Sequence, residues 1–101
     1  MHASVAAAKG AVEGMTRSLA AELAPNIRVN CIAPSLTDTP LAEKLLSSDQ
    51  KRAAMAERHP LKRVGTVDDI ASLAEILLTD RASWITGQVI GVDGGMSRLR
   101  N

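Results

Sequence analysis

Aromatic side chains are almost absent from this chain of 101 residues, which contains one tryptophan, Trp84, and neither tyrosine nor phenylalanine. A small domain that folds alone usually fills its centre with bulky rings. The scarcity of rings therefore indicates that the chain is part of a larger packed structure. At 46% apolar and 23% charged residues, with no low-complexity tract, the composition is nevertheless that of a globular protein and excludes disorder.

Cysteine is also scarce, and long apolar runs are missing. The single Cys31 excludes an internal disulfide and a cysteine-based zinc site, and we expect no metal site. Its apolar neighbours predict a small buried hydrophobe. No apolar run reaches the ~20 residues of a membrane span. The N-terminus has no basic segment followed by a hydrophobic core, so we expect a cytoplasmic chain that does not enter a membrane.

A large net charge is absent as well, because 12 basic residues face 11 acidic ones. This balance argues against attraction to nucleic acid or to anionic membranes. The densest basic stretch, Lys51 to Arg63, also contains Glu57 and Pro60, which favours a solvated face. A helical DNA-binding domain is one alternative for the function of the chain, but it would need a stripe of basic residues for recognition, which the sequence does not show.

The clearest helical segment runs from Ser4 to Leu23, which has no proline and is rich in alanine. Its large apolar side chains recur at helical spacing, at Val12, Met15, Leu19 and Leu23. A second stripe holds small residues, Ala6, Gly10 and Gly14. Glycine inside a helix costs up to ~1 kcal/mol relative to alanine, so this stripe predicts the close approach of another backbone. Pro25 and Asn26 are expected to end the helix.

Two short apolar runs, residues 27–33 and 88–92, predict buried strands. Three helical pieces are expected between them, at 39–46, 47–59 and 66–80. Their signals are Thr39 as N-cap before Pro40, Pro60 after the second piece, and Thr66 with Asp69 in capping-box spacing. The "VDGG" at 92–95 lacks the pattern of a phosphate loop and predicts a chain-ending turn.

The expected order is helix, strand, helices, strand. Two strands joined by so long a helical connection are expected to be parallel, with a right-handed crossover. Parallel strands need both faces covered and usually more neighbours than two. The fold class is therefore α/β, the C-terminal portion of a doubly wound parallel sheet, with no internal domain boundary. Strand 27–33 is expected to expose an edge that invites association.

These segments together resemble the C-terminal part of the short-chain dehydrogenase/reductase family, from about His2 to Ser97. "AAAKGAVEGMTRSLAAELAPNIRVNCIAPSLTDTPL" is similar to the family's active-site helix with the strand and cofactor loop that follow. "HPLKRVGTVDDIASLAEILLTDRASWITGQVIGVDGG" is similar to its last helix and strand. The resemblance implies that residues 1–101 form a partial Rossmann-like domain. The glycine-rich loop, the cofactor-selecting residue and the catalytic serine of the family all precede the part represented here.

The family's catalytic motif is Tyr-x-x-x-Lys, and the register of the following residues places Lys9 at the lysine and Val5 at the tyrosine. In the family the tyrosine is the general acid/base, and the lysine lowers its pKa from ~10 and binds the nicotinamide ribose. Valine has no proton to give. The resemblance therefore implies a cofactor role for Lys9, whereas the residues alone are also consistent with a solvated lysine. His2 and Ser4 are the nearest polar candidates for a substitute acid.

The second motif, "PSLTDTP", is similar to the loop that meets the nicotinamide end of the cofactor. The resemblance implies cofactor binding by Pro34, by a backbone group at Thr37 and by Thr39, although Thr39 also fits a helix start. Ser35 stands where the family has glycine. Arg28 and Asn30, in the preceding strand, are assigned structural roles.

The resemblance implies an oxidoreductase that uses NAD or NADP and moves hydride to or from a carbonyl, alcohol or enoyl substrate. Without a tyrosine or the glycine-rich loop, the 101-residue chain is expected to be inactive. The alternative is a non-catalytic interaction module derived from the family. Either function is compatible with a homo-oligomer formed through the helix at 4–23, with no nucleic acid and no membrane as partner.

Overall fold

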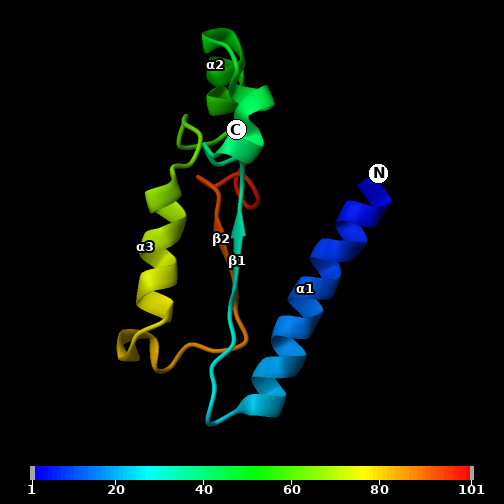
Figure 1. The fold of residues 1–101 in the computed structure, drawn as a ribbon, viewed down its shortest axis with the longest axis vertical. Coiled ribbons are helices and arrows are strands. Elements are labelled where there is room, and N and C mark those ends of the chain that lie inside the picture. Colours follow the sequence, from blue (N-terminus) through cyan, green and yellow to red (C-terminus); the bar gives the residue numbers. More distant parts are fainter. Residues whose placement is uncertain (1, 101) are drawn as a thin grey trace. The chain divides into compact units, whose positions relative to one another are not determined.

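The computed structural model describes residues 2–100. Along the chain lie α1 (His2–Leu23), β1 (Cys31–Pro34), the 3-10 helix η1 (Pro40–Leu46), α2 (Asp49–Glu57), α3 (Val67–Leu77), the 3-10 helix η2 (Asp80–Ala82) and β2 (Val89–Val92), as Figure 1 shows. The predicted order of helix, strand, helices and strand is confirmed, and the chain is an α/β fold. None of the helices in the described part of the chain is both long and apolar enough to span a membrane.

β1 and β2 form a two-stranded sheet. The Cys31 N–H donates to the Gln88 carbonyl at 2.8 Å, and the Ser35 N–H donates to the Val92 carbonyl at 3.3 Å. Because both partners advance along the chain together, the strands are parallel, as predicted. Cys31 is partly exposed, which corrects the expectation of a buried thiol.

The first strand begins later than the predicted 27–33 and ends at Pro34. Side chains supply much of the bonding before Cys31: the Val29 N–H donates to the Thr86 hydroxyl at 3.1 Å, and the Gln88 N–H donates to Asn30 Oδ1 at 3.1 Å. A regular ladder therefore starts only at Cys31. Pro34 is accommodated as the last residue of the strand, where the missing N–H interrupts no ladder.

The chain divides into two units, of which the first comprises the residues up to Cys31 together with Ile76–Ile90. In this unit α1 buries Thr16 and Ala20. A Cβ built on Gly87 would lie 3.5 Å from the Ala20 Cβ, so the small side chain of Ala20 meets the turn at Gly87. Gly87 has a φ of 72°, a left-handed conformation that glycine adopts without strain.

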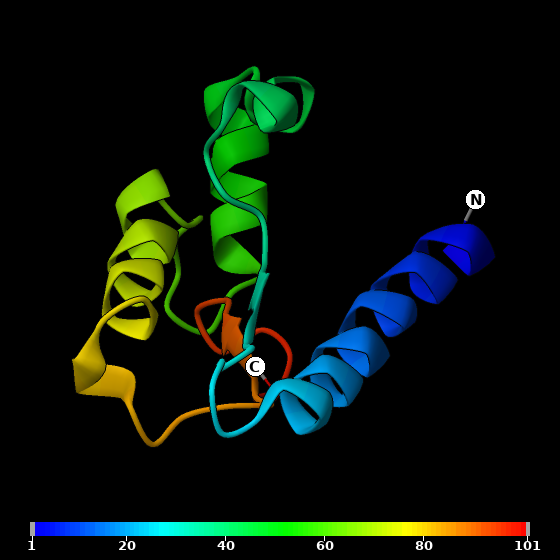
Figure 2. The same ribbon diagram turned by 60° about the horizontal axis from the view of Figure 1, so that its bottom comes forward.

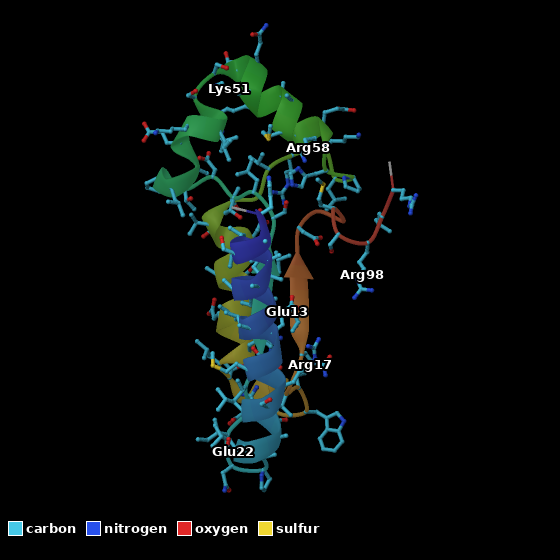
Figure 3. All side chains as sticks on the ribbon, turned by 90° about the vertical axis from the view of Figure 1, so that its right-hand side faces the viewer. Glu13, Arg17, Glu22, Lys51, Arg58 and Arg98 are labelled. Atoms are coloured by element: carbon cyan, nitrogen blue, oxygen red, sulfur yellow. The ribbon has the colours of Figure 1, made fainter. Side chains whose placement is uncertain are left out.

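The predicted apolar stripe of α1 is only partly covered: Val12 remains 48% and Met15 56% exposed. No segment within residues 2–100 approaches the stripe of small residues, because a Cβ at Gly10 or Gly14 would meet no atom within 4 Å, and the approach of a partner helix stays a prediction. Charged side chains of the same helix, Arg17 and Glu22, project into solvent (Figure 3). The helix is covered only around Thr16 and Ala20, and this leaves the face with Gly10 and Gly14 open.

The second unit comprises Ile32–Glu75 and the residues from Gly91 onward. Here η1 packs against α2 (Figures 1 and 2) and buries Ala42 and Leu46. The predicted capping box of α3 is confirmed: the Thr66 N–H donates to Asp69 Oδ2 at 2.7 Å, and the Asp69 N–H donates to Thr66 Oγ1 at 3.2 Å.

Thr39 precedes a helix that begins with Pro40, as predicted, but its side chain makes no capping hydrogen bond and the helix is 3-10 in form. A 3-10 turn leaves fewer unpaired N–H groups for a side chain to satisfy. Ser48 does cap α2, since its hydroxyl accepts the Lys51 N–H at 3.1 Å.

Candidate functional site

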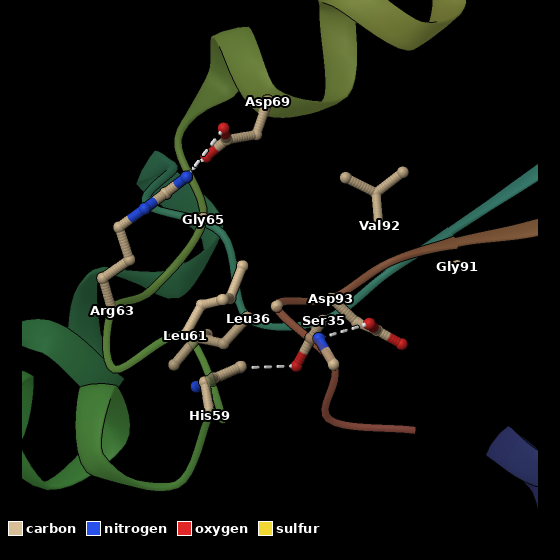
Figure 4. A pocket seen from close by; sticks show the side chains of 12 residues that line it. Ser35, Leu36, His59, Leu61, Arg63, Gly65, Asp69, Gly91, Val92 and Asp93 are labelled. Carbon is tan, nitrogen blue, oxygen red and sulfur yellow. Dashed lines mark hydrogen bonds and ion pairs between the residues drawn. The ribbon is translucent and has the colours of Figure 1, made fainter. Parts of the chain in front are cut away.

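The loops that follow β1 and β2 bound a cavity of about 290 Å³ in the second unit (Figure 4). Carboxyl ends of parallel strands meet at one edge of a sheet, where such folds bind ligands. The cavity is lined by residues after β1, by the turn at 59–65 and by residues 91–95, among them Ser35, Leu36, His59, Leu61, Arg63 and Val92.

A backbone bridge holds the loop after β1 against the turn before α3. The Asp38 N–H donates to the Gly65 carbonyl at 2.8 Å, and the Gly65 N–H donates to the Leu36 carbonyl at 2.9 Å. Thr37 lies between Leu36 and Asp38, which make these two bonds. In such a parallel bridge the N–H and C=O of the middle residue point away from the bridge partner, here Gly65. A Cβ at Gly65 would lie 3.2 Å from Thr37 Oγ1, so only glycine permits this close approach without a shift.

The Ser35 hydroxyl lies 2.8 Å from Nε2 of His59 (Figure 4). On the other side of the ring, Nδ1 of His59 lies 2.8 Å from the Met55 carbonyl. His59 is 3% exposed. No sequence pattern assigns His59 a role. The signal that could have found it was Ser35, a hydroxyl where the family resemblance predicts glycine.

An ion pair fixes the entry to α3 beside the cavity. The Arg63 guanidinium donates to the Asp69 carboxylate at 2.6 and 3.0 Å (Figure 4). These hydrogen bonds, together with those from the Thr66 N–H and hydroxyl, hold the pKa of Asp69 far below its usual range. The same pair raises the pKa of Arg63. Both charges are therefore engaged with each other and with the cap of α3.

The turn after β2 is organised by Asp93, whose carboxylate accepts the Gly95 N–H at 2.9 Å and also the N–H and hydroxyl of Ser97. The Ser97 hydroxyl is the main cause of the lowered pKa of Asp93. Gly94 and Gly95 adopt left-handed φ values of 61° and 91°. The "VDGG" segment is thus a turn, as predicted.

Pro34 is the last residue of β1, and Thr37 and Thr39 follow it in the loop before η1, so all three lie in the second unit. Thr39 lines another cavity, of about 330 Å³, with Pro40, Glu43 and Leu46. Asp38 and Arg52 border it and form an ion pair at 3.0 Å. The Thr39 hydroxyl makes no capping hydrogen bond to η1.

Val5 and Lys9 lie one turn apart on α1, in the first unit, and both side chains are exposed. Their spacing places them on one face of the helix. No hydrogen bond or ion pair within residues 2–100 engages the Lys9 ammonium group.

Arg28 and Asn30 have structural contacts. Arg28 donates to the Thr79 carbonyl at 3.1 Å, and Asn30 Nδ2 donates to the Ile85 carbonyl at 3.0 Å. Among the described residues there is no group of three or more His, Cys, Asp or Glu side chains that could hold a metal ion.

Comparison with known proteins identifies the class of the chain. The family described as enoyl-(acyl carrier protein) reductase matches residues 1–97. The chain belongs to the short-chain dehydrogenase/reductase family. The structural neighbours include Rossmann-fold members of this family, such as a short-chain dehydrogenase/reductase from Brucella melitensis, which has a TM-score of 0.82 and 41% identity and covers 89% of this chain and 36% of that one.

Particular relatives differ in their named activities. A 3-oxoacyl-[acyl-carrier-protein] reductase of Thermotoga maritima is 46% identical over 90% of this chain and 37% of its own length. A tropinone reductase homolog of Arabidopsis thaliana is 47% identical over 90% of this chain and 35% of its own. The structure of 4-hydroxyisoleucine dehydrogenase complexed with NADH has a TM-score of 0.86 and 35% identity, and the match covers 93% of this chain and 39% of that one. The chain thus spans little more than a third of the length of these curated relatives.

Proposed function

We propose that this chain provides the nicotinamide side of an NAD(P)-dependent oxidoreductase that transfers hydride to or from a carbonyl, alcohol or enoyl substrate. The proposal rests on the loop after β1. There the hydrogen bonds of the bridge to Gly65 are made by Leu36 and Asp38, so the N–H and C=O of Thr37 point away from the bridge. A carboxamide has one acceptor and one donor group, which match these two backbone groups. The Thr39 hydroxyl adds a polar group that is not used by a helix cap.

The family resemblance gives these residues complementary roles toward a nicotinamide nucleotide. Thr37 would orient the carboxamide, Thr39 would bind a neighbouring polar group, and the Lys9 ammonium would donate to ribose hydroxyls. The cofactor supplies the hydride when it is bound. The resemblance assigns the proton to position 5, and Val5 has none to give. We therefore propose that the 101-residue chain binds the nicotinamide side without turning over substrate.

The test uses nicotinamide mononucleotide, the half of the cofactor that this loop is proposed to meet. With ¹⁵N-labelled chain, we expect its titration to shift the amide signals of Thr37 and Thr39, whereas adenosine monophosphate leaves them unchanged. Thr39→Val, which keeps the shape and removes the hydroxyl, should weaken the effect about fivefold. Equal shifts with both nucleotides, or none with either, would contradict the proposal.

Lys9 is tested in the same titration. We expect Lys9→Ala to weaken binding about tenfold or more, because it removes a charged hydrogen-bond donor. Arg17→Ala is the matched control, since Arg17 is an exposed cation on the same helix. If the two variants weaken binding equally, Lys9 acts only through general charge.

A second function, self-association through α1, is favoured by the exposed Val5, Val12 and Met15 and by the open face at Gly10 and Gly14. Small residues allow close backbone approach between helices. Sedimentation velocity distinguishes the two functions. A defined oligomer without nicotinamide mononucleotide binding supports an interaction module, whereas binding supports the oxidoreductase site.

A further inference from the structure

We propose that His59 is a positioning residue for the loop at 35–39 and acts through the hydroxyl of Ser35. That this loop meets nicotinamide rests on the function proposed above. That His59 positions the loop rests only on contacts within the second unit. Ser35 and His59 are 24 residues apart in the sequence, yet Ser35 Oγ lies 2.8 Å from His59 Nε2 (Figure 4).

The bonding of His59 determines which ring nitrogen carries the proton. The Met55 carbonyl, 2.8 Å from Nδ1, can only accept, so Nδ1 must be protonated. In the neutral imidazole Nε2 then has a lone pair, which accepts a hydrogen bond from the Ser35 hydroxyl group. This is the less common tautomer of a solvated histidine, and it follows from the fold rather than from the ring itself.

His59 is enclosed by the turn after β2. It is almost fully buried, and a Cβ built on Gly94 would lie 3.6 Å from the His59 Cβ. The next backbone segment is also tied to this turn, because the Leu61 N–H donates to the Gly94 carbonyl at 3.1 Å. The imidazole is therefore placed by this turn, and the loop contacts it through the Ser35 hydroxyl.

Ser35 connects His59 to the loop through hydrogen bonds. Its N–H donates to the Val92 carbonyl, and its own carbonyl accepts the Thr37 hydroxyl at 3.0 Å. The hydroxyl bond to His59 thus completes the bonding of the residue that begins the loop. Glycine, which the family has at this position, offers no side chain for this contact. The Ser35–His59 pair is a feature of this chain that the family motif does not supply.

The tautomer of His59 gives a direct spectroscopic test. The chain has two histidines, so the exposed His2 is an internal reference in a long-range ¹H–¹⁵N spectrum of the full chain. We expect His59 to show protonated Nδ1 at neutral pH. Ser35→Ala should shift the Nε2 signal, and Ser35→Thr, which restores a hydroxyl, should return it toward the original value. Protonated Nε2 in His59 would overturn the inference.

Amide hydrogen exchange reports whether the loop depends on the pair. The N–H groups of Asp38 and Gly65 form the bridge that holds the loop. We expect Ser35→Ala and His59→Gln to speed their exchange about fivefold to tenfold, the effect of losing one hydrogen bond. Ser35→Thr should remain close to wild type. Ser47→Ala, which removes an exposed hydroxyl that bonds Lys44 elsewhere in this unit, should have no effect.

Unchanged exchange at Asp38 and Gly65 in Ser35→Ala would overturn the positioning role. If His59→Gln unfolds the second unit, the Ser35→Ala and Ser35→Thr pair still decides the question in folded protein. Faster exchange without any change in nicotinamide mononucleotide binding would uphold the positioning role and contradict the proposed function instead. The two hypotheses therefore fail on different measurements.

Discussion

Asn30 illustrates how one side chain takes the place of a strand partner. Its Oδ1 accepts the Gln88 N–H at 3.1 Å and its Nδ2 donates to the Ile85 carbonyl at 3.0 Å. The amide thus joins segments that are more than 50 residues apart, immediately before the parallel ladder begins at Cys31. Both bonds satisfy backbone groups that would otherwise need solvent or another strand.

We expect Asn30→Ala to lower the free energy of unfolding by about 1–3 kcal/mol, because it leaves the Gln88 N–H without its partner and the Ile85 carbonyl with only the long hydrogen bond from Arg28 at 3.5 Å. Urea denaturation followed by circular dichroism measures this change. Asn26→Ala is the control, since Asn26 is an exposed residue in the turn after α1. An equal effect of the two substitutions would contradict the assigned role of the Asn30 side chain.

Asp69 makes the start of α3 sensitive to acid. Its pKa is lowered in the folded chain, chiefly by the hydrogen bonds from Arg63 and then by those from Thr66. A group with a depressed folded pKa stabilises the fold at pH values above its unfolded pKa, ~4 for aspartate. This contribution is lost as the pH falls from there toward the folded pKa.

We therefore expect Asp69→Asn to destabilise α3 at pH 7 and to have a shrinking effect as the pH falls below ~4. Hydrogen exchange of α3 amides, measured against pH in both proteins, checks this prediction. Asp68→Asn is a matched control because Asp68 is also in the first turn of α3 and is exposed. A destabilisation by Asp69→Asn that is independent of pH would show that its charge is unimportant.

Among the helices, α1 shows most clearly the difference between periodicity and burial. Spacing of apolar residues predicted the helix, and α1 indeed runs over His2–Leu23. The side that is buried, however, carries Thr16 and Ala20, two small side chains, while Val12 and Met15 remain about half exposed. Helical spacing identifies which residues share a face, but a neighbouring segment decides which face is covered.

We expect Gly10→Ala and Gly14→Ala each to stabilise α1 by about 0.5–1 kcal/mol, because alanine loses less backbone entropy and the added methyl group meets no atom. Thermal unfolding followed by circular dichroism tests this in dilute chain.

Gly87→Ala is the contrasting control and should destabilise the chain, since Gly87 has a positive φ. A loss of stability in Gly10→Ala or Gly14→Ala that grows with protein concentration would show that a second copy covers this face.

Taken as a whole, the chain has few buried side chains and leaves large apolar ones in solvent. Ala20, Ala42, Leu46 and Ala82 are its buried hydrophobic residues in the described range, whereas Leu41 and Trp84 are each 98% exposed. The chain also spans little more than a third of its curated relatives. The shortage of aromatic rings in the sequence agrees with this small number of buried side chains.

For the isolated chain we expect no nicotinamide-dependent turnover of ketone, alcohol or enoyl substrates, because position 5 has no proton donor. Absorbance of NADH and NADPH at high protein concentration measures this. Turnover that is abolished by Lys9→Ala would contradict the prediction. If such turnover were also lost in His2→Ala, His2 would be identified as the substitute acid.

Short-range sequence signals predicted the helices, the capping box at Thr66 and Asp69, the turn at Gly94 and Gly95, and the family. The helices, the capping box and the turn depend on residues at most a few positions apart, whose interactions are the same in most folds, and the family follows from the order of these segments along the chain. The beginning of β1, the covered side of α1 and the bond between Ser35 and His59 could not be read in this way. Each of them depends on segments that are distant in the chain and meet only when the sheet forms, so only tertiary structure decides them.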